Sequence, residues 1–299
     1  MANFSNLPDF DSLPAVPGMP SGCAWGVFDK NGEKDILGCL NLLTADIKRE
    51  AFKEARDGVS ISLNWPLNAI AKPGFGRRAF EHVVISVLDA PNPGHTFDDE
   101  VAFNTQSSSQ WDGLVHFGHQ PTGLYYNASK PTKENLMGGF RHRDKTIPTL
   151  NHWHQHGGLV GRGVLLDYVA FAAHKGIKFD CFDSHSISIQ DLEVIAEYQG
   201  TTFKPGDILL VRTGYTERLD SMNADEQEEV LTRAKAAGVE ANIEAARWLW
   251  NHRFAAVAGD TIAFEVLIPR SDEQIAAEGG HKFDLSQQVT LLMLLWREY

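Results

Sequence analysis

The chain has 299 residues, of which 43% are hydrophobic and 22% charged, a balance typical of a globular protein with a large core. Its 39 acidic residues outnumber 27 basic ones, and the net charge of −12 argues against binding to nucleic acid or to an anionic membrane surface. Three widely spaced cysteines without a C-x-x-C pair predict neither a disulfide framework nor a zinc finger, so a cytoplasmic, reducing location is expected.

Residues 1–20 are predicted to form a proline-rich N-terminal arm. They lack the basic and apolar regions of a secretory signal, so they are not expected to be one. Residues 21–299 contain no internal repeat and no low-complexity linker, so they are expected to form a single domain. No stretch of about 18 apolar residues occurs, which argues against a membrane span. A small-molecule substrate is therefore the expected partner.

Five stretches have the composition of β-strands. Residues 59–65 alternate between apolar and polar side chains, and residues 82–88 form a compact β-branched run. Three further apolar runs, at 163–167, 207–212 and 255–258, are typical of buried strands.

Three helices are predicted among these strands. The first begins after Ser188, because Asp191 three residues later can complete a capping box, and it ends at Gly200. The second covers residues 239–250, where apolar side chains recur every three or four positions and share one face. The third, residues 224–237, is charged and is expected on the surface. Mixed strands and helices predict an α/β or α+β domain.

Asp112 and His116 are the first candidates for catalysis. A carboxylate next to an imidazole can orient the ring and prepare it for proton transfer. Gly113 between them makes an irregular turn as favourable as a helix, and in such a turn the pair could equally serve only to hydrogen-bond a loop.

Amide and hydroxyl side chains are concentrated just before this pair, in residues 106–110, and Trp111 follows them. Polar groups beside an aromatic ring suit the binding of a polar, planar ligand. Gln106 and Ser109 are therefore predicted to bind substrate, and Gln110 to act as a catalytic hydrogen-bond donor. There is no G-x-S-x-G elbow and no glycine-rich loop entering a helix, which argues against an α/β serine hydrolase and a nucleotide cofactor.

Several segments in order resemble the cyclase superfamily that includes bacterial-type kynurenine formamidase and isatin hydrolase. The similarity extends over nearly the whole chain. It implies a swivelling β/β/α fold, with a central barrel-like β-sheet flanked by helices, and a homo-oligomer. The similar segments are residues 25–29, 37–44, 161–167, 205–214 and 258–260 together with Glu265.

The family's metal motif, H-x-G-T-H-x-D-x-P-x-H, is altered in this chain. Gln106 and Gln110 stand where its first two histidines are expected, whereas Asp112 and His116 are kept. In metal-dependent members the resemblance implies that those histidines and the aspartate hold zinc or manganese, and that the last histidine assists hydrolysis. Near the C-terminus, Ser286 replaces a histidine of the dinuclear members.

This exchange weakens any metal site. Imidazole is a good zinc ligand, whereas an amide oxygen is a weak, hard donor that suits calcium or magnesium better. Structural zinc sites reach about 10–16 kcal/mol in apparent binding free energy, so tight zinc is not expected without the histidines. A weakly held divalent ion (Zn, Mn or Mg) on Asp112, Gln106 and Gln110 stays open, and no cofactor is certain.

Three functions remain open. In the first, His116 and Asp112 act in hydrolysis of a cyclic amide, a formamide or a lactone, as in secondary-metabolite or aromatic breakdown chemistry. In the second, a metal-independent site performs ring closure, dehydration or isomerisation of an oxygenated natural product. In the third, the chain is a silent binding protein of the same fold.

Other residues are candidates for the pocket wall. Trp25, Phe117 and Tyr126 could line it, although aromatic side chains serve as core residues about as often. The resemblance implies that Asp260 and Glu265 belong to the segment that closes the pocket.

Overall fold

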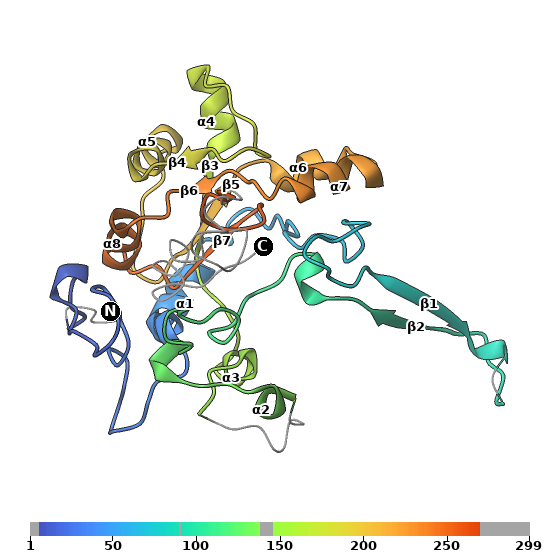
Figure 1. Cartoon of the computed structure of the whole chain (residues 1–299), viewed down its shortest axis with the longest axis horizontal. Helices are drawn as coiled ribbons and strands as arrows, with labels where there is room; N and C mark the ends of the chain where they lie inside the picture. Colours follow the sequence, from blue (N-terminus) through green and yellow to red (C-terminus); the bar gives the residue numbers. More distant parts are fainter. Residues whose placement is uncertain (1–5, 90, 138–145, 270–299) are drawn as a thin grey trace.

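A three-stranded parallel sheet forms the centre of the protein (Figure 1). The structure, a computed structural model, describes residues 6–89, 91–137 and 146–269. The sheet has the order β3–β5–β7, formed by Gly163–Asp167, Ile208–Arg212 and Ala256–Gly259. These are the three apolar runs predicted as buried strands, and those predictions are confirmed.

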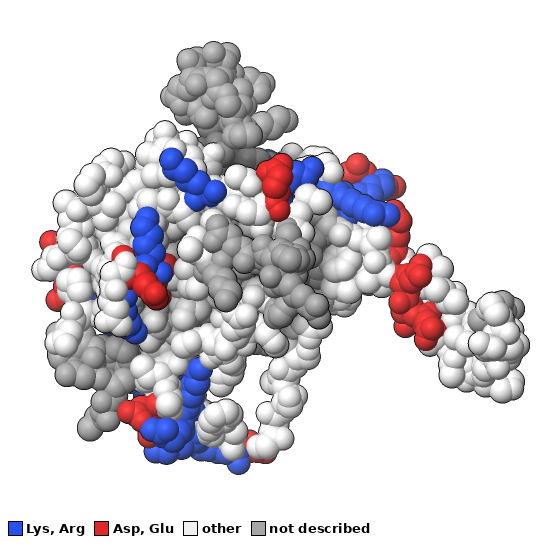
Figure 2. Space-filling view, turned by 90° about the horizontal axis from the view of Figure 1, so that it is seen from below, with Lys and Arg blue, Asp and Glu red and all other residues white. Residues whose placement is uncertain are grey.

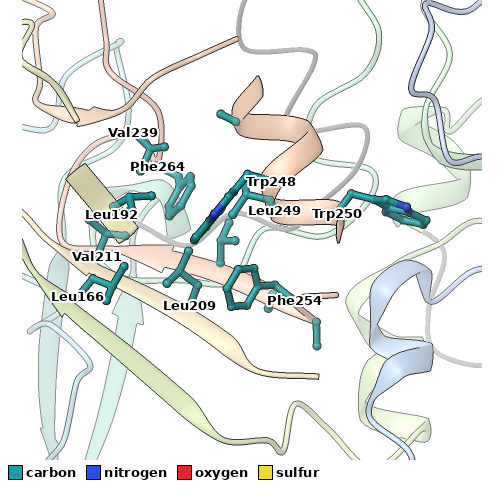
Figure 3. Packing of buried hydrophobic residues seen from close by; sticks show 14 of the residues in the cluster. Leu166, Leu192, Leu209, Val211, Val239, Trp248, Leu249, Trp250, Phe254 and Phe264 are labelled. Carbon is teal, nitrogen blue, oxygen red and sulfur yellow. The ribbon is translucent and has the colours of Figure 1, made fainter. Parts of the chain in front are cut away.

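One face of this sheet packs against the helices α4 (Tyr168–Lys175), α5 (Ile189–Gln199) and α8 (Ile243–Asn251). Because successive side chains of a strand point to opposite faces, alternate residues of β3 and β5 are buried. The main hydrophobic core lies between these layers. Figure 3 shows its central side chains, among them Leu166, Leu192, Leu209, Val211, Leu249 and Phe254.

The opposite face of the sheet is only partly covered. Leu165 of β3 is 49% exposed, and Leu210 of β5 is half-buried. A groove of about 430 Å³ runs along this face, and its wall includes Leu63, Ser109 and Gln110. The groove therefore brings two candidate site residues to the open face of the central sheet.

Helix α5 forms as the sequence predicts. The Ser188 hydroxyl accepts a hydrogen bond from the backbone N–H of Asp191, whose carboxylate accepts one from the N–H of Ser188 in return. Gly200 ends the helix with a φ of 66°, a left-handed conformation that glycine adopts without strain. The predicted capping box and helix end are both confirmed.

The other two helices are shorter than predicted, because tertiary pairing takes over their ends. Val239 lies in strand β6 (Gly238–Val239), where its N–H donates to Phe264 O at 2.9 Å, so α8 starts only after the Asn242 cap. Helix α7 (Ala224–Thr232) also ends before Ala237, whose N–H donates to Cys181 O at 2.9 Å.

Of the two strands predicted in the N-terminal half, one is found in the structure and the other is not. Residues 82–88 largely coincide with β1 (Glu81–Ser86), which forms an antiparallel hairpin with β2 (Phe97–Ala102). Residues 59–65 form no regular secondary structure, and within the described ranges they pair with no strand, so that prediction is wrong. The described strands form one open sheet and two two-stranded ladders, and the barrel-like closure is not confirmed.

Shorter elements complete the fold. In the described part of the chain, no helix combines the length and apolar character needed to cross a membrane. The remaining elements are η1 (Phe10–Ser12), η2 (Gly38–Leu42), α1 (Ala45–Phe52), η3 (Val87–Asp89), η4 (Thr105–Ser107), η5 (Tyr126–Ala128), α2 (Lys133–Met137), α3 (Leu150–Gln155), β4 (Ser186–Ile187) and α6 (Tyr215–Asp220).

The N-terminal arm is fastened to α8. Phe10 is buried in the main core, and its backbone N–H donates to the side chain of Asn251 at 2.9 Å. Just after α8, the Arg253 guanidinium donates to Leu7 O at 3.0 Å and to Asp9 Oδ1 at 2.9 Å. Residues 7–10 of the predicted arm therefore take part in the core packing.

Candidate functional site

The segment with Asp112 and His116 follows the hairpin directly. Thr105–Ser107 form a short 3-10 helix capped by Asn104, whose side chain accepts from Gln106 N at 2.9 Å. After it the chain runs in turns, with His116 N donating to Gly113 O at 2.8 Å. Of the two conformations that the sequence leaves open, the irregular turn is the one adopted.

Asp112 is the centre of the site. Its side chain is 4% exposed, and its Oδ1 accepts from Gln106 Nε2 at 2.6 Å. His116 Nδ1 lies 3.5 Å from the same oxygen, and the imidazole side chain is 29% exposed. This separation is longer than an N–H···O hydrogen bond of about 2.7–3.2 Å, and catalytic contacts are often longer before a substrate binds. The structure thus brings Gln106, Asp112 and His116 together.

The Gln110 amide braces the loop. In one orientation of this amide, Nε2 donates to the carbonyl oxygen of Thr105 at 2.7 Å and to that of Ser108. Both the nitrogen and the oxygen of the amide are then satisfied. The reverse orientation allows a 3.3 Å bond to Gln106 Oε1 but turns the Gln110 oxygen toward carbonyl oxygens, so we favour the first. Gln110 lies beside the site, and its role as a catalytic donor stays a prediction.

Hydroxyl groups tie this segment to Trp65. Ser109 Oγ accepts from Trp65 N at 2.8 Å, and Ser108 Oγ donates to the carbonyl oxygens of Trp65 and Pro66 at 3.1 and 3.0 Å. The Ser109 hydroxyl therefore positions a neighbouring segment, and a contact between this hydroxyl and substrate remains a prediction.

The three aromatic residues predicted to line the pocket lie in two different parts of the structure. Trp25 and Tyr126 are buried in a small cluster with Cys23, where the Tyr126 hydroxyl donates to Asp35 Oδ2 at 2.9 Å. Burial and the nearby Asp35 charge raise the pKa of Tyr126 well above its ordinary value, so the phenol stays neutral. Phe117 is half-buried beside His116 in the chain. Substrate contact by these three residues stays a prediction.

Asp260 supports the turn that leads into α6. Its carboxylate accepts from the N–H and hydroxyl of Thr213, at 2.6 and 2.8 Å, and from Gly214 N at 2.8 Å. Burial raises the pKa of this carboxyl, although the bonds from Thr213 and Gly214 oppose the rise. Glu265 is 1% exposed and its backbone bridges to Val239. The Asp260 carboxylate thus holds the turn before α6, and a role of either acid in substrate binding stays a prediction.

Gln106 also borders a second space, a cavity of about 50 Å³. Trp65, Ile70 and Ile262 supply apolar parts of its wall, and Tyr215 at the start of α6 supplies a phenol. Tyr215 is 2% exposed, and its hydroxyl has no hydrogen-bond partner in the described part of the chain. A buried hydroxyl without a partner destabilises a protein by about 1–3 kcal/mol, unless a ligand supplies one.

Sequence comparison assigns the chain to a known family. The sequence model of the family described as "Putative cyclase" matches residues 43–266, most of the chain. The chain belongs to the cyclase family. Its membership identifies a cyclase-like enzyme and confirms the resemblance drawn from the sequence motifs. Among proteins of curated function, none matches the sequence.

Solved structures resemble this chain to different degrees. A crystal structure of a cyclase superimposes with a TM-score of 0.70 at 24% identity, covering 92% of this chain and 83% of the other. This similarity shows the fold that the two proteins share. Isatin hydrolase A from Ralstonia solanacearum aligns with a TM-score of 0.49 at 16% identity, covering 85% and 84%. Isatin hydrolase A from Labrenzia aggregata, bound to benzyl benzoate, aligns with a TM-score of 0.45 at 15% identity. The alignment covers 80% of this chain and 78% of the other.

The donor groups of this cyclase-family site do not fit zinc or manganese. The Gln106 amide nitrogen donates to Asp112 Oδ1, so an N–H group faces the oxygen that would bind the ion. Within residues 6–89, 91–137 and 146–269, no three His, Cys, Asp or Glu side chains gather as metal ligands. Amides are also poor ligands for these metals. Ser286, the further position that the family motif indicates, lies outside the described residues.

Two residues of the candidate site, Trp65 and Tyr215, were not predicted from the sequence. Trp65 is anchored to Ser108 and Ser109 from more than forty positions away, and Tyr215 meets Gln106 only across the cavity. Trp65 is the last residue of one predicted strand and Tyr215 lies shortly after another, and residues near a strand end are possible ligand contacts. That signal is too common to single them out without the tertiary contacts.

Proposed function

We propose that this cyclase-family protein acts on a small carbonyl compound through acid–base chemistry of its own side chains. The observation that supports it is the buried carboxylate oxygen of Asp112, which is shared by Gln106 Nε2 at 2.6 Å and His116 Nδ1 at 3.5 Å. Gln106 holds the carboxylate, and the carboxylate in turn orients the imidazole. This chain of contacts is the arrangement that a proton-transferring histidine requires.

The proposed reaction is hydrolysis of a cyclic amide, a formamide or a lactone. Water adds to the carbonyl carbon as His116 Nε2 takes one of its protons. Asp112 stabilises the imidazolium that forms, and it does so strongly because its side chain is 4% exposed. The imidazolium then returns the proton to the leaving nitrogen or oxygen as its bond to the carbonyl carbon breaks.

A second candidate is a ring closure, dehydration or isomerisation that uses the same pair. The wall of the cavity at Gln106 favours it, because Trp65, Ile70 and Ile262 make this space apolar and unfavourable for water. Product formed in ¹⁸O-labelled water separates the two reactions. Hydrolysis places the label in the product, whereas isomerisation or ring closure leaves the product unlabelled.

We expect activity to survive removal of divalent metal ions. Purified protein is assayed on a panel of cyclic amides, aryl formamides and lactones before and after dialysis against a chelator, with elemental analysis of both samples. Unchanged kcat/KM in a sample free of zinc and manganese supports the side-chain mechanism. Loss of activity that returns with one stoichiometric ion would instead assign the reaction to a bound metal.

Tyr215→Phe tests whether the cavity receives substrate. If the Tyr215 hydroxyl donates to the substrate, its removal lowers kcat/KM by about tenfold, the effect of one hydrogen bond of roughly 1.4 kcal/mol. The melting temperature should stay equal or rise, because the variant no longer buries a hydroxyl to which the described residues supply no partner. Unchanged kcat/KM would remove Tyr215 and its cavity from the substrate site.

A further inference from the structure

The cavity beside Gln106 is closed and small. Among the side chains that line it, Ser108, Tyr215, Leu219 and Thr261 are each at most 5% exposed. Its volume of about 50 Å³ holds a group of a few atoms, whereas pockets that receive small-molecule ligands measure about 300–1,000 Å³. A substrate can therefore reach the Tyr215 hydroxyl only if part of the cavity wall moves.

One side of this wall has no regular secondary structure. Residues 65–77 (the strap), all of which the structure describes, form turns and bends but no helix or strand, and they supply Trp65, Ile70 and Phe75 to the cavity. Figure 1 shows the strap beside α6 and α7, which supply the opposite side. Phe75 is 53% and Leu67 41% exposed, so the strap is only lightly packed. A segment of this kind opens at lower cost than the helices it covers.

The two ends of the strap are fastened to the segment that carries the candidate site. At one end, Trp65 N donates to Ser109 Oγ at 2.8 Å, and Trp65 O accepts from Ser108 Oγ at 3.1 Å. At the other end, the Arg77 guanidinium donates to Gln106 O at 3.2 Å. The strap therefore spans the cavity between two fixed points, and its middle can lift without releasing the site segment.

Gln227 of α7 holds the middle of the strap. It is 5% exposed, and its side-chain amide donates from Nε2 to Ala69 O at 3.1 Å and accepts at Oε1 from Ala71 N at 3.3 Å. Nε2 also donates to Leu219 O at 3.1 Å, which keeps the amide in place between α6 and α7. Because the bonds to Ala69 and Ala71 form only while the strap lies against α7, Gln227 is a latch for the closed position.

Lys72 adds a weaker contact next to this latch. Its Nζ lies 2.8 Å from Asp225 Oδ1 and 2.7 Å from Glu228 Oε2, both on α7, and all three side chains are exposed. Figure 2 shows basic and acidic side chains next to one another near the base of the projecting hairpin, into which the strap leads. Exposed ion pairs contribute little to stability and are screened by salt. Gln227 is therefore the main contact that holds the middle of the strap.

A strained turn lies close to the second fixed end of the strap. Phe75 has a φ of 61° and Gly76 a φ of 68°, and both values are left-handed. Glycine adopts this conformation freely, but a residue with a side chain, such as Phe75, is disfavoured there. Strained residues of this kind cluster at ligand clamps and switch regions. Lifting the strap lets this turn relax, which lowers the cost of opening.

We propose that the strap is a lid, which lifts to admit substrate to the cavity and closes over it for the reaction. The proposal rests on the proposed function, because it takes the cavity to be where substrate binds. Closure separates the space beside Gln106 from bulk water, and Gln106 donates to Asp112, so the charge interactions of the acid–base pair are strengthened. Gln227 is then a positioning residue that acts through the strap.

Labelling of a thiol inside the cavity tests the lid without any substrate. Thr261 lines the cavity and is 4% exposed, so Thr261→Cys places a thiol that N-ethylmaleimide reaches only through the open state. Cys39 is buried in the main core and reports global unfolding in the same sample, and peptide mass spectrometry separates the two thiols. We expect the introduced thiol to react faster than Cys39. Low concentrations of urea should accelerate Cys39 far more, because a local opening exposes little surface.

Adding Gln227→Leu is expected to raise the labelling rate of the introduced thiol about tenfold or more, because the closed strap loses two hydrogen bonds. The matched control is Gln199→Leu in α5. Gln199 also bridges two backbone groups, since it accepts from Asp167 N at 2.8 Å and donates to Leu165 O at 2.7 Å, but these groups belong to β3 and not to the strap. This control should leave the labelling rate within about twofold.

Three results would overturn the lid. They are equal labelling of the introduced thiol and Cys39, no rise in the labelling rate with Gln227→Leu, and an equal rise with Gln199→Leu. Substrate turnover is a separate result. If the thiol is gated but none of the carbonyl compounds is turned over, the proposed reaction is wrong and the lid stands. If turnover occurs while the thiol is not gated, the lid alone is wrong.

Discussion

His116→Ala is expected to lower kcat/KM by about 100- to 10,000-fold, the usual contribution of a positioned general base. The imidazole contacts the buried Asp112 carboxylate through Nδ1, so in the proposed mechanism Nε2 is the atom that exchanges a proton with substrate or water. The His116 side chain is 29% exposed, and removing it should change the free energy of unfolding little. Steady-state kinetics and thermal unfolding of the same preparation measure both effects.

His119→Ala is the matched control, because His119 lies three residues further and bonds Thr122 Oγ1 at 2.8 Å rather than Asp112. Its activity should stay within about twofold of the unmodified protein. Asp112→Asn should resemble His116→Ala in activity, since the amide cannot stabilise an imidazolium as a carboxylate does. If His116→Ala keeps full turnover, the acid–base proposal is wrong. If no substrate is turned over but ligand binding persists, the protein is a binding protein of this fold.

Gly238→Ala is expected to destabilise the fold by about 3 kcal/mol, because strand β6 approaches the backbone of Glu265 too closely for a side chain. An added Cβ would lie 2.4 Å from the Glu265 carbonyl carbon and 2.6 Å from both Glu265 O and Val266 N. These are backbone atoms in a buried bridge, so they cannot turn aside as a flexible side chain would. The melting temperature should fall by roughly 6–12 °C in thermal unfolding.

Gly74→Ala is the comparison for this effect. Neither Gly74 nor Gly238 has a positive φ, and a Cβ at Gly74 meets no atom within 4 Å. Its melting temperature should stay within about 2 °C of the original. A Gly238→Ala protein as stable as Gly74→Ala would contradict the close approach between β6 and residue 265.

The local sequence pattern predicted those elements whose side chains are buried throughout or whose ends are satisfied by neighbouring residues. The strands β3, β5 and β7 are recognisable because a buried parallel strand is apolar along its length. The α5 helix is recognisable because Ser188, Asp191 and Gly200 satisfy its ends locally. Residues 59–65 have the alternation of a strand, but a ladder also needs a partner, and the sequence pattern contains no information about one.

The residues of the candidate site also fall into those that the sequence pattern predicted and those that only the fold brings together. Motif spacing pointed to Gln106, Asp112 and His116, which lie close along the chain and whose side chains meet at the Asp112 carboxylate. Tyr215 could not be found this way, because its contact with the Gln106 cavity depends on how α6 packs. The hydroxyls of Ser108 and Ser109 likewise bind Trp65 through contacts of high sequence separation.

By itself, the sequence determined the family, the apolar strands of the core and the pairing of Asp112 with His116, because each depends on residue type and short spacing. Only the tertiary structure decided that Gln106 donates to the Asp112 carboxylate, that Tyr215 borders the cavity at Gln106 and that no third strand of the described residues joins the β1–β2 hairpin. The physical reason is that hydrogen-bond direction, burial and strand pairing depend on how groups are placed in space, which residue type and order do not specify.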